Sequence, residues 1–245
     1  MNDRRVFGIT LPDAYHEALR CLHMIGDISD CADWNTRQRE LAMTMVVANP
    51  LCEPMISRCF IGGAEELQQY VMEMLDGILD FEVEKGNWTY TYHQRMGNQI
   101  DFVVNELKRN PSSRRAVMCI RTPKDMGSDD PACLQHIQYF IRDGKLDCMV
   151  LFRSNDACKA TFMNAFALIM LQKRIADELG VPVGTYIHRA NSFHCYEKDF
   201  GILKGYVDRI NCGENLIYRY EGDWKEDMED VIPDILKKVE ELKSR

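Results

Sequence analysis

An Asp-Gly dipeptide at residues 143–144 constrains the fold of this chain more than any other short segment. It separates two mainly apolar, strand-like runs, HIQYFIR (136–142) and KLDCMVLF (145–152). Asp-Gly is favoured in two-residue hairpin turns, because both central residues of such a turn need positive φ. The sequence therefore predicts an antiparallel hairpin.

The segment 163–179 predicts a helix that is buried on all sides. Its middle carries apolar residues around the whole circumference rather than in one stripe, and Gly180 is a typical helix end. Periodicity predicts further helices at 11–25, 64–75, 100–107 and 232–245 and strands at 41–49, 115–122 and 183–189. These elements follow one another without a regular βαβ rhythm and without a linker, so we expect an α+β fold in a single domain, residues 1–245.

Composition limits the partners of this chain. The formal net charge is −8, so we expect no nucleic-acid partner, and an anionic ligand would need a local cluster of arginines. No apolar run approaches the roughly 20 residues that span a bilayer, and the charged N-terminus lacks a signal-peptide core. We therefore expect a cytoplasmic protein without membrane contact. The ten cysteines show no zinc-ligand spacing, so we expect reduced thiols and no metal site.

Two polar groups stand out against this acidic background. Arg114 and Arg115 follow a loop-like NPSS segment, and guanidinium groups bind phosphate with two parallel hydrogen bonds. The tetrapeptide RSND (153–156) interrupts an apolar stretch directly after the hairpin. Because a buried unpaired charge is costly, this interruption indicates either a ligand site or a structural ion pair. For the arginine pair, the alternative is a solvated loop.

Four further residues carry side chains that are suited to catalysis or ligand binding. Cys133 directly precedes the first hairpin strand, Asn164 lies at the start of the apolar helix, and His194 and Tyr196 lie two apart in an extended segment, on one face. Each has an ordinary structural explanation: an apolar filler, a helix cap and a half-buried polar edge. The residues alone leave both interpretations open.

The order and spacing of these motifs resembles the thymidylate synthase family. The motifs are NPSSRR (110–115), PAC (131–133), DGKL (143–146), RSND (153–156), FMN (162–164) and HCY (194–196), with WTYTYHQRM (88–96) similar to the family's tyrosine segment. The likeness runs from about Trp88 to Asp199 and favours the short archaeal-type members over the long bacterial ones. It implies a thymidylate synthase-like fold, which is a mixed, mainly antiparallel twisted sheet flanked by helices, with the sheet used for dimerisation.

The resemblance also implies catalytic roles. Cys133 corresponds to the nucleophile that adds to C6 of a pyrimidine nucleotide, so that C5 can attack a one-carbon unit. Arg153 would hold the phosphate and favour the thiolate, because nearby positive charge lowers the pKa of a thiol. Tyr92 corresponds to the tyrosine near the proton-transfer site. Asn164 corresponds to the amide that reads O4 and N3, and it favours uracil over cytosine, which presents the opposite donor–acceptor order.

Substrate-binding roles follow from the same resemblance. Arg114 and Arg115 correspond to a pair that reaches into the neighbouring subunit's phosphate site, which implies a homodimer with shared active sites. Ser154 corresponds to a phosphate-contacting hydroxyl. His194 and Tyr196 correspond to the pair that binds the sugar 3′-hydroxyl.

The remaining implied residues concern the cofactor, a further phosphate-binding arginine and the catalytic glutamate. The cofactor is 5,10-methylenetetrahydrofolate, oriented by Asp156. Arg37, in DWNTRQRE (33–40), is a candidate for an additional phosphate-binding arginine. The catalytic glutamate has three candidates in the helix predicted at 64–75: Glu65, Glu66 and Glu73.

The reaction implied first is conversion of dUMP to dTMP. Leu134 stands where the family usually has histidine, and Phe152 where it usually has glutamine. We interpret these departures as changes on the folate side, which leaves two alternatives. One is hydroxymethylation of dUMP, dCMP or CMP, in which water reaches the methylene intermediate. The other is a nucleotide-binding protein without turnover, against which the intact Cys133 argues.

Overall fold

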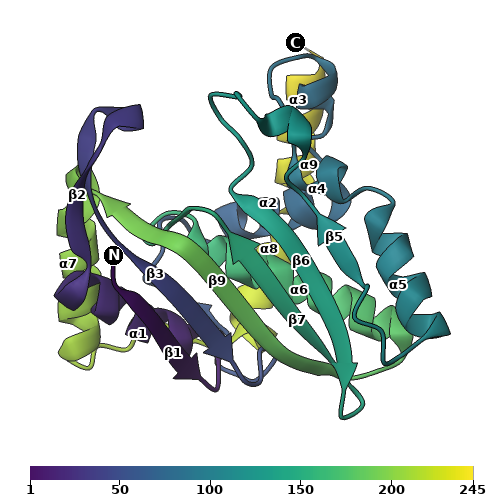
Figure 1. Cartoon of the computed structure of the whole chain (residues 1–245), viewed down its shortest axis with the longest axis horizontal. Coiled ribbons are helices and arrows are strands. Elements are labelled where there is room, and N and C mark those ends of the chain that lie inside the picture. The colour runs from purple at the N-terminus through teal and green to yellow at the C-terminus, as the bar shows by residue number, and fades with distance from the viewer. Residues whose placement is uncertain (245) are drawn as a thin grey trace.

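A mixed eight-stranded sheet forms the centre of the fold (Figure 1). The computed structural model describes residues 1–244. The strands are β1 (Asp3–Gly8), β2 (Asp27–Cys31), β3 (Thr36–Val47), β4 (Ile56–Ser57), β5 (Val117–Cys119), β6 (Leu134–Arg142), β7 (Lys145–Phe152), β8 (Asn155–Asp156), β9 (Val183–Tyr196) and β10 (Ile217–Tyr218).

The strand order in the main sheet is β1-β3-β9-β7-β6-β5, with β2 also paired to β3 and β8 to β9. β3 runs antiparallel to β2 and β9, and β6 runs antiparallel to β5 and β7. The β1–β3, β7–β9 and β8–β9 pairs are parallel. β4 and β10 form a separate small sheet. The expected mixed sheet flanked by helices is therefore confirmed.

The helices lie behind or beside the main sheet in Figure 1, and no described helix crosses the face turned to the viewer. They are α1 (Leu11–Ile25), α2 (Ala64–Asp76), α3 (Phe81–Glu84), α4 (Tyr92–Met96), α5 (Gln99–Arg109), α6 (Thr161–Leu179), α7 (Phe200–Asn211), α8 (Lys225–Asp230) and α9 (Ile232–Lys243). Within residues 1–244, none has the length and apolar character needed to cross a membrane.

The hairpin forms where the Asp-Gly signal predicts it. Asp143 and Gly144 both have positive φ, 49° and 71°, as a turn that matches the twist of the flanking strands requires. From this turn, β6 and β7 pair continuously until the register shifts by one residue near Gln135. Such a bulge bends one strand and re-aims the side chains that follow it. It lies next to Cys133.

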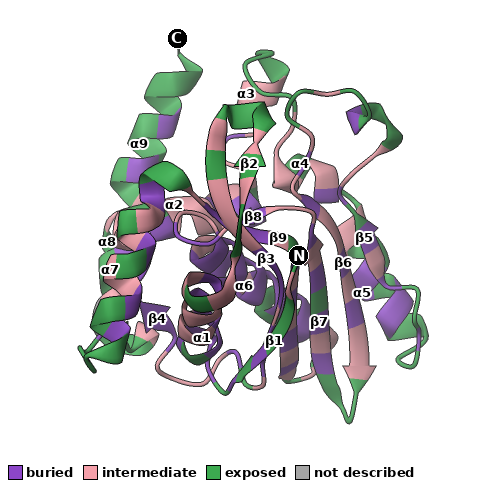
Figure 2. Cartoon of the chain, turned by 60° about the vertical axis from the view of Figure 1, so that its left-hand side comes forward, coloured by how far each residue is buried: buried purple, intermediate pink, exposed green. Residues whose placement is uncertain are grey.

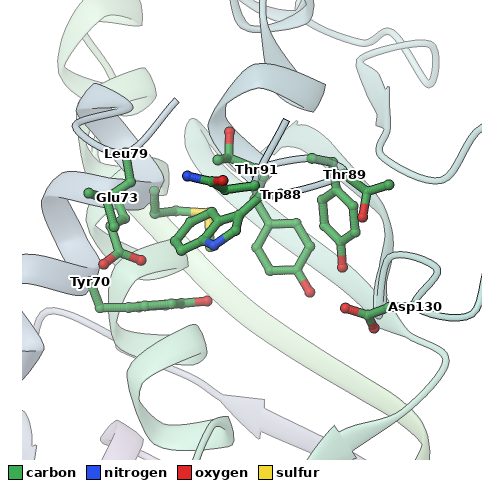
Figure 3. Close-up of a pocket in the computed structure, with 11 residues that line it drawn as sticks. Tyr70, Glu73, Leu79, Trp88, Thr89, Thr91 and Asp130 are labelled. Atoms are coloured by element: carbon green, nitrogen blue, oxygen red, sulfur yellow. The ribbon is translucent and has the colours of Figure 1, made fainter. Parts of the chain in front are cut away.

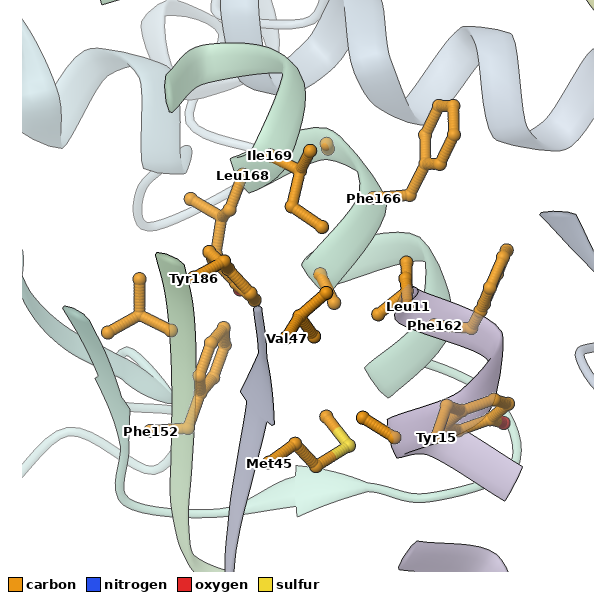
Figure 4. Close-up of a cluster of buried hydrophobic side chains, with 14 of the residues drawn as sticks. Leu11, Tyr15, Met45, Val47, Phe152, Phe162, Phe166, Leu168, Ile169 and Tyr186 are labelled. Atoms are coloured by element: carbon orange, nitrogen blue, oxygen red, sulfur yellow. The ribbon is translucent and has the colours of Figure 1, made fainter. Parts of the chain in front are cut away.

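α6 is the central helix, as its uniformly apolar sequence predicts. It packs against β7 and β9 on one side and against α1, α2 and α5 on the others. Figure 4 shows side chains of α6 pointing to different sides: Leu168 points toward the sheet and Phe162 lies near Tyr15 of α1, whereas Phe166 points away from the sheet. Burying an aromatic or aliphatic side chain of this size stabilises the fold by about 1.5–3 kcal/mol. The helix ends at Gly180, whose φ of 68° suits glycine.

The other predicted helices form with small changes at their ends. The helix predicted at 11–25 has those bounds, and it begins with a capping box in which Thr10 Oγ1 accepts from the Asp13 N–H and Asp13 Oδ2 accepts from the Thr10 N–H. α2 and α5 extend the predicted 64–75 and 100–107 by one or two residues. The helix predicted at 232–245 forms as α9 over Ile232–Lys243, and residue 245 lies outside the described residues. α9 carries both buried and exposed bands in Figure 2. Ile235 and Val239 are buried against α2, whereas Leu236 and Leu242 are exposed.

Four predicted strands have different bounds in the structure. β6 begins at Leu134 rather than residue 136. β3 begins at Thr36 rather than residue 41, because its first half pairs with β2. β5 covers only Val117–Cys119 of the predicted 115–122. β9 continues past residue 189 to Tyr196, because it pairs with β3 along its length. Its extension brings His194 and Tyr196 into the sheet.

The helix-free face of the sheet carries several apolar side chains. Along β7, residues 146, 148, 150 and 152 are buried against the helices, so the alternate residues lie on the opposite face. Met149 on this face is 39% exposed and neighbours Ile187 of β9, and Phe7 of β1 is 66% exposed. This face is accessible in the single subunit.

Candidate active site

A cavity of about 560 Å³ lies where β7 ends and β6 begins, and we call it the Cys133 cavity. Its lining comes from the β2–β3 hairpin, α2, α4, the segment before β6, the segment after β7, the start of α6 and the end of β9. It brings together the following predicted site residues: Tyr92, Cys133, Arg153, Ser154, Asp156, Asn164, His194 and Tyr196.

The hairpin register places Cys133 beside Arg153. The Arg153 N–H donates to the Cys133 carbonyl at 2.8 Å, directly after the last paired residues of β6 and β7. The guanidinium then folds back, with Nη2 donating to the Pro131 carbonyl at 2.7 Å and Nε to the Ala132 carbonyl at 3.2 Å. Arg153 therefore holds the segment that carries the thiol.

The Cys133 thiol is half-buried, and its protonation depends on opposing effects. Burial raises its pKa, the Arg153 guanidinium lowers it and the Asp130 carboxylate raises it, with a net shift upward. The expected effect of Arg153 thus has the right direction but is outweighed by burial in the single subunit. The resting form at neutral pH is the thiol.

Two tyrosines and the amide of Asn164 also line the cavity. Tyr92 Oη accepts a hydrogen bond from the Leu134 N–H at 3.3 Å, so its hydroxyl lies next to the segment that carries Cys133. Asn164, which is 5% exposed, projects from the first turn of α6, and its Oδ1 accepts a hydrogen bond from the Tyr70 hydroxyl of α2. Asn164 is therefore no helix cap but a fixed amide at the cavity wall.

His194 offers an unused acceptor. Its Nδ1 lies 3.2 Å from the Ser192 carbonyl, and because a carbonyl only accepts, Nδ1 carries the proton of the neutral ring. Ser154 Oγ lies 3.3 Å from the same nitrogen. Nε2 is buried and has no hydrogen-bond partner among the described residues. A buried acceptor without a partner is uncommon, so Nε2 is available to a hydrogen-bond donor such as water or a hydroxyl.

Asp156 and its neighbour Asn155 form the floor next to α6. Asp156 Oδ1 accepts hydrogen bonds from the N–H groups of Cys158 and Lys159, both at 2.9 Å. Asn155 Oδ1 lies 2.9 Å from Nε2 of His188, whose Nδ1 lies 3.0 Å from the Tyr186 hydroxyl. His188 is fully buried, and burial lowers its pKa to about 3.

The buried His188 predicts a loss of stability in acid. Because the unfolded chain binds a proton near pH 6.5 and the folded chain only near pH 3, the free energy of unfolding should fall as pH drops from 6.5 toward 3, by up to about 1.4 kcal/mol per pH unit. His188→Gln removes this pH-dependent contribution to the free energy of unfolding. The difference in the free energy of unfolding between wild type and variant should therefore narrow as the pH falls. Urea unfolding between pH 7.5 and 4.5 measures the gap, and a constant gap would contradict the assignment.

Arg37 does not line the Cys133 cavity. It is exposed and pairs with Glu197, with Nη1 3.7 Å from Oε1. The reason is strand alternation: Gln38 and Glu40 of β3 line the cavity, so Arg37 and Arg39 point to the other face. The same alternation in the sequence could have identified Gln38 and Glu40 as wall residues.

Arg114 and Arg115 also lie outside the cavity. Both are exposed and precede β5, and the Arg114 carbonyl accepts from the Gln138 side chain at 3.0 Å. Gln138 lies several residues along β6 from Cys133, so the pair is remote from the thiol of its own chain. Within one subunit, Arg153 is the one Lys or Arg among the described lining residues, which include the carboxylates of Asp33, Glu40, Asp130 and Asp156.

A second cavity of about 380 Å³ adjoins the first, and we call it the aromatic cavity (Figure 3). The two share Tyr70, Tyr92 and Asp130. In Figure 3, Trp88 lies between the helix that carries Tyr70 and Glu73 and the loop that carries Asp130. No sequence signal separated Trp88 or Tyr70 from ordinary packing residues.

Of the three candidate glutamates, only Glu73 lines a cavity. It faces the aromatic cavity, and burial raises its pKa. Glu66 instead caps the start of α2 through the Gly63 N–H at 2.7 Å, and Glu65 pairs with Lys238.

Comparison with known proteins agrees with this geometry. A family model described as thymidylate synthase matches residues 68–223, more than half of the chain. Two archaeal proteins described as "Putative thymidylate synthase" are similar over most of their length. The one from Methanocaldococcus jannaschii is 32% identical over 214 residues, which cover 80% of this chain and 93% of that protein. The one from Methanosarcina barkeri is 30% identical over 218 residues, or 85% and 96%.

The chain belongs to the thymidylate synthase family. Among solved structures, the thermostable thymidylate synthase A from Bacillus subtilis matches with a TM-score of 0.65 and 20% identity, over 81% of this chain and 84% of that one. This match establishes a thymidylate synthase-like fold. The resemblance drawn from the sequence is confirmed, and the chain is a member of a methyltransferase enzyme family.

Two departures from the thymidylate synthase pattern have a structural explanation. Leu134 and Phe152 are paired with each other across the hairpin, and both are completely buried. Phe152 also stacks on the ring of His188, with centroids 4.8 Å apart. Neither residue lines the Cys133 cavity or the aromatic cavity. They form one apolar pair across the hairpin, and our interpretation of them as folate-side changes stays a prediction.

Proposed function

We propose that this protein transfers a one-carbon unit to C5 of a pyrimidine nucleoside monophosphate, with conversion of dUMP to dTMP as its reaction. The observation that carries the proposal is the set of groups around one cavity: the Cys133 thiol, the Arg153 guanidinium, the fixed amide of Asn164 and the unpaired Nε2 of His194. A binding protein without turnover has no use for the thiol in this set.

The cavity residues suit a nucleotide in one orientation. Arg153 and Ser154 offer hydrogen-bond donors to a phosphate, and His194 Nε2 accepts from the sugar 3′-hydroxyl, with Tyr196 beside it at a ring distance of 4.8 Å. Asn164 then meets O4 and N3 of the base. In this pose, C6 of the ring faces Cys133.

The chemistry assigned to the chain is covalent activation of the ring. The Cys133 thiolate forms a bond from Sγ to C6, and the electrons of the C5–C6 double bond move toward O4. The Asn164 NH₂ stabilises the negative charge that develops there. After C5 has gained its substituent, loss of the C5 proton and departure of the folate nitrogen would leave an exocyclic methylene. Addition of hydride or water to that carbon, with cleavage of the Sγ–C6 bond, would then restore the C5–C6 double bond. Tyr92, whose hydroxyl lies beside the Cys133 segment, is placed to assist that proton transfer.

The aromatic cavity fits 5,10-methylenetetrahydrofolate. Its walls offer the rings of Trp88, Tyr90 and Tyr92 for stacking on a flat heterocycle, and the carboxyl of Glu73 can accept from ring N–H groups. Asp156 lines the adjoining Cys133 cavity and can orient the same molecule. When bound, the folate supplies the one-carbon unit and, for a methyl product, the hydride.

We also propose a homodimer with shared active sites, formed through the helix-free face of the sheet. That face is apolar around Met149 and Ile187, so a second copy of the chain would cover it. A phosphate dianion facing one guanidinium and four carboxylates is poorly balanced in a single subunit. Arg114 and Arg115 from a second copy would supply the missing positive charge.

Hydroxymethylation is the second candidate product. The aromatic cavity is lined by polar side chains as well as aromatic rings, namely Glu73, Thr89 and Thr91. Polar groups of this kind retain water near a reactive methylene. The steps that residues of this protein carry out, up to bond formation at C5, are the same for both products. Only the final capture, by hydride or by water, differs.

Product analysis tests the proposed function. We expect tritium release from 5-tritiated dUMP in the presence of methylenetetrahydrofolate, and at least about tenfold less from dCMP, because Asn164 reads the base. Mass spectrometry separates a methyl product from a hydroxymethyl product by one oxygen atom. No release from either nucleotide would contradict an enzymatic role and leave a binding protein.

A further inference from the structure

The hydroxyl of Tyr70 determines what Asn164 can present to a ligand. Tyr70 lies on α2 and Asn164 on α6, two helices that pack together, and Tyr70 lines both cavities. Its O–H donates to Asn164 Oδ1. Burial raises the pKa of Tyr70, so the phenol keeps its proton and remains a donor at all physiological pH values.

The free side of the amide is then its NH₂ group. Asn164 Nδ2 has no hydrogen-bond partner within residues 1–244, and the residue lines the Cys133 cavity. A carbonyl oxygen has two lone pairs, so Oδ1 can accept from Tyr70 and from a ligand together. The position of Tyr70 thus determines which end of the amide is the acceptor oxygen and which end is the donor NH₂ group.

An amide without this anchor would serve two different bases. Uracil presents O4 as an acceptor and N3–H as a donor, whereas cytosine presents N4–H₂ as a donor and N3 as an acceptor. Rotation of a carboxamide by 180° exchanges its oxygen and nitrogen, and so converts one complementary order into the other. A free asparagine therefore discriminates weakly between the two.

Rotation of Asn164 is opposed by Tyr70. A rotated amide would turn an N–H toward the phenol oxygen, which can accept it, but the hydroxyl hydrogen would lose its acceptor. Among the described residues, Asn164 Oδ1 is the sole acceptor of that hydrogen. Tyr70 is partly buried and lines both cavities, so rotation of the amide costs it one hydrogen bond, which corresponds to up to about tenfold in an equilibrium constant.

We propose that Tyr70 is a specificity-determining positioning residue, which locks the Asn164 amide in the orientation that accepts uracil and rejects cytosine. This inference rests on the proposed function for the identity of the preferred base. It assigns the selectivity to a pair of residues from two helices rather than to Asn164 alone.

The test compares binding of dUMP and dCMP by calorimetry, in a Cys133→Ser background that prevents covalent addition. Tyr70→Phe keeps the ring and removes the hydroxyl, so we expect the ratio of the two affinities to fall about tenfold. Tyr206→Phe is the matched control, because Tyr206 of α7 lines neither of the two cavities, and it should leave the ratio unchanged. An equal shift in both variants would overturn the inference.

A second pair of variants separates the role of Tyr70 from general damage. A carboxylate has two equivalent oxygens and gains nothing from being held against rotation, so Tyr70→Phe added to Asn164→Asp should leave the dUMP to dCMP ratio of Asn164→Asp unchanged. Binding with an unchanged ratio in Tyr70→Phe alone would overturn the inference and leave the proposed function intact. If neither nucleotide binds the parent protein, the proposed function and the inference both fail.

Discussion

Replacing Cys133 with serine should abolish turnover while leaving nucleotide binding largely intact. The hydroxyl is close in size to the thiol, but it is a far weaker nucleophile at neutral pH, because it does not ionise there. Loss of a covalent nucleophile typically lowers kcat by several orders of magnitude, so we expect tritium release from dUMP to fall at least about 10⁴-fold. Isothermal calorimetry with dUMP should still detect binding through Arg153, Asn164 and His194.

The matched control is Cys212→Ser. Cys212 is an exposed cysteine at the C-terminal end of α7, away from both cavities and from the helix-free face of the sheet, and its replacement should leave tritium release unchanged. Retained turnover in Cys133→Ser would show that another group attacks C6. Equal losses in both variants would indicate general damage rather than loss of a nucleophile.

Mixing two inactive variants should restore activity if the active sites are shared. Arg114→Ala removes the guanidinium that we assign to the neighbouring site, and Cys133→Ser removes the nucleophile of its own site. A hybrid dimer then has one site with both residues intact and one site with neither. Random reassociation of equal amounts should restore about a quarter of the wild-type sites. The rate of tritium release after mixing and refolding measures the recovery.

The structure offers a sharp control for this experiment. Arg153 lines the same cavity as Cys133 of its own chain, so Arg153→Ala mixed with Cys133→Ser leaves every site of a hybrid dimer damaged. This pair should recover nothing. Recovery in neither mixture would contradict shared sites, and recovery in both would mean that Arg153 is not part of the site of its own chain.

The meeting of Cys133 and Arg153 could be predicted from the sequence to within one residue. An uninterrupted ladder from the Asp143-Gly144 turn would place Leu134 opposite Arg153. The bulge near Gln135 shifts this register, so that Leu134 faces Phe152 and the Cys133 carbonyl accepts the Arg153 N–H. In a hairpin, the turn sets the register of both strands, because each pair of residues fixes the next. The bulge has no comparable sequence signal.

Whether Arg37 and Tyr70 line the cavity could not be predicted from the sequence. The basic segment around Arg37 suggested a phosphate ligand, but the pleat of β3 directs Gln38 and Glu40 to the cavity and Arg37 away from it. Tyr70 belongs to the apolar stripe of α2, and periodicity alone assigns it to the core. Whether a residue of such a stripe meets packed hydrocarbon or a cavity depends on the neighbouring helix, which the local pattern does not contain.

By itself, the sequence determined the family, the hairpin, the buried helix and eight of the residues that line the Cys133 cavity. These follow from turn chemistry, local periodicity and motif spacing, all of which act between residues close in the chain. Only the tertiary structure decided which face of β3 meets the cavity, that Leu134 and Phe152 form one apolar pair, and that Tyr70 anchors Asn164. Those outcomes depend on strand register and helix packing between distant segments, where a shift of one residue changes which side chains meet.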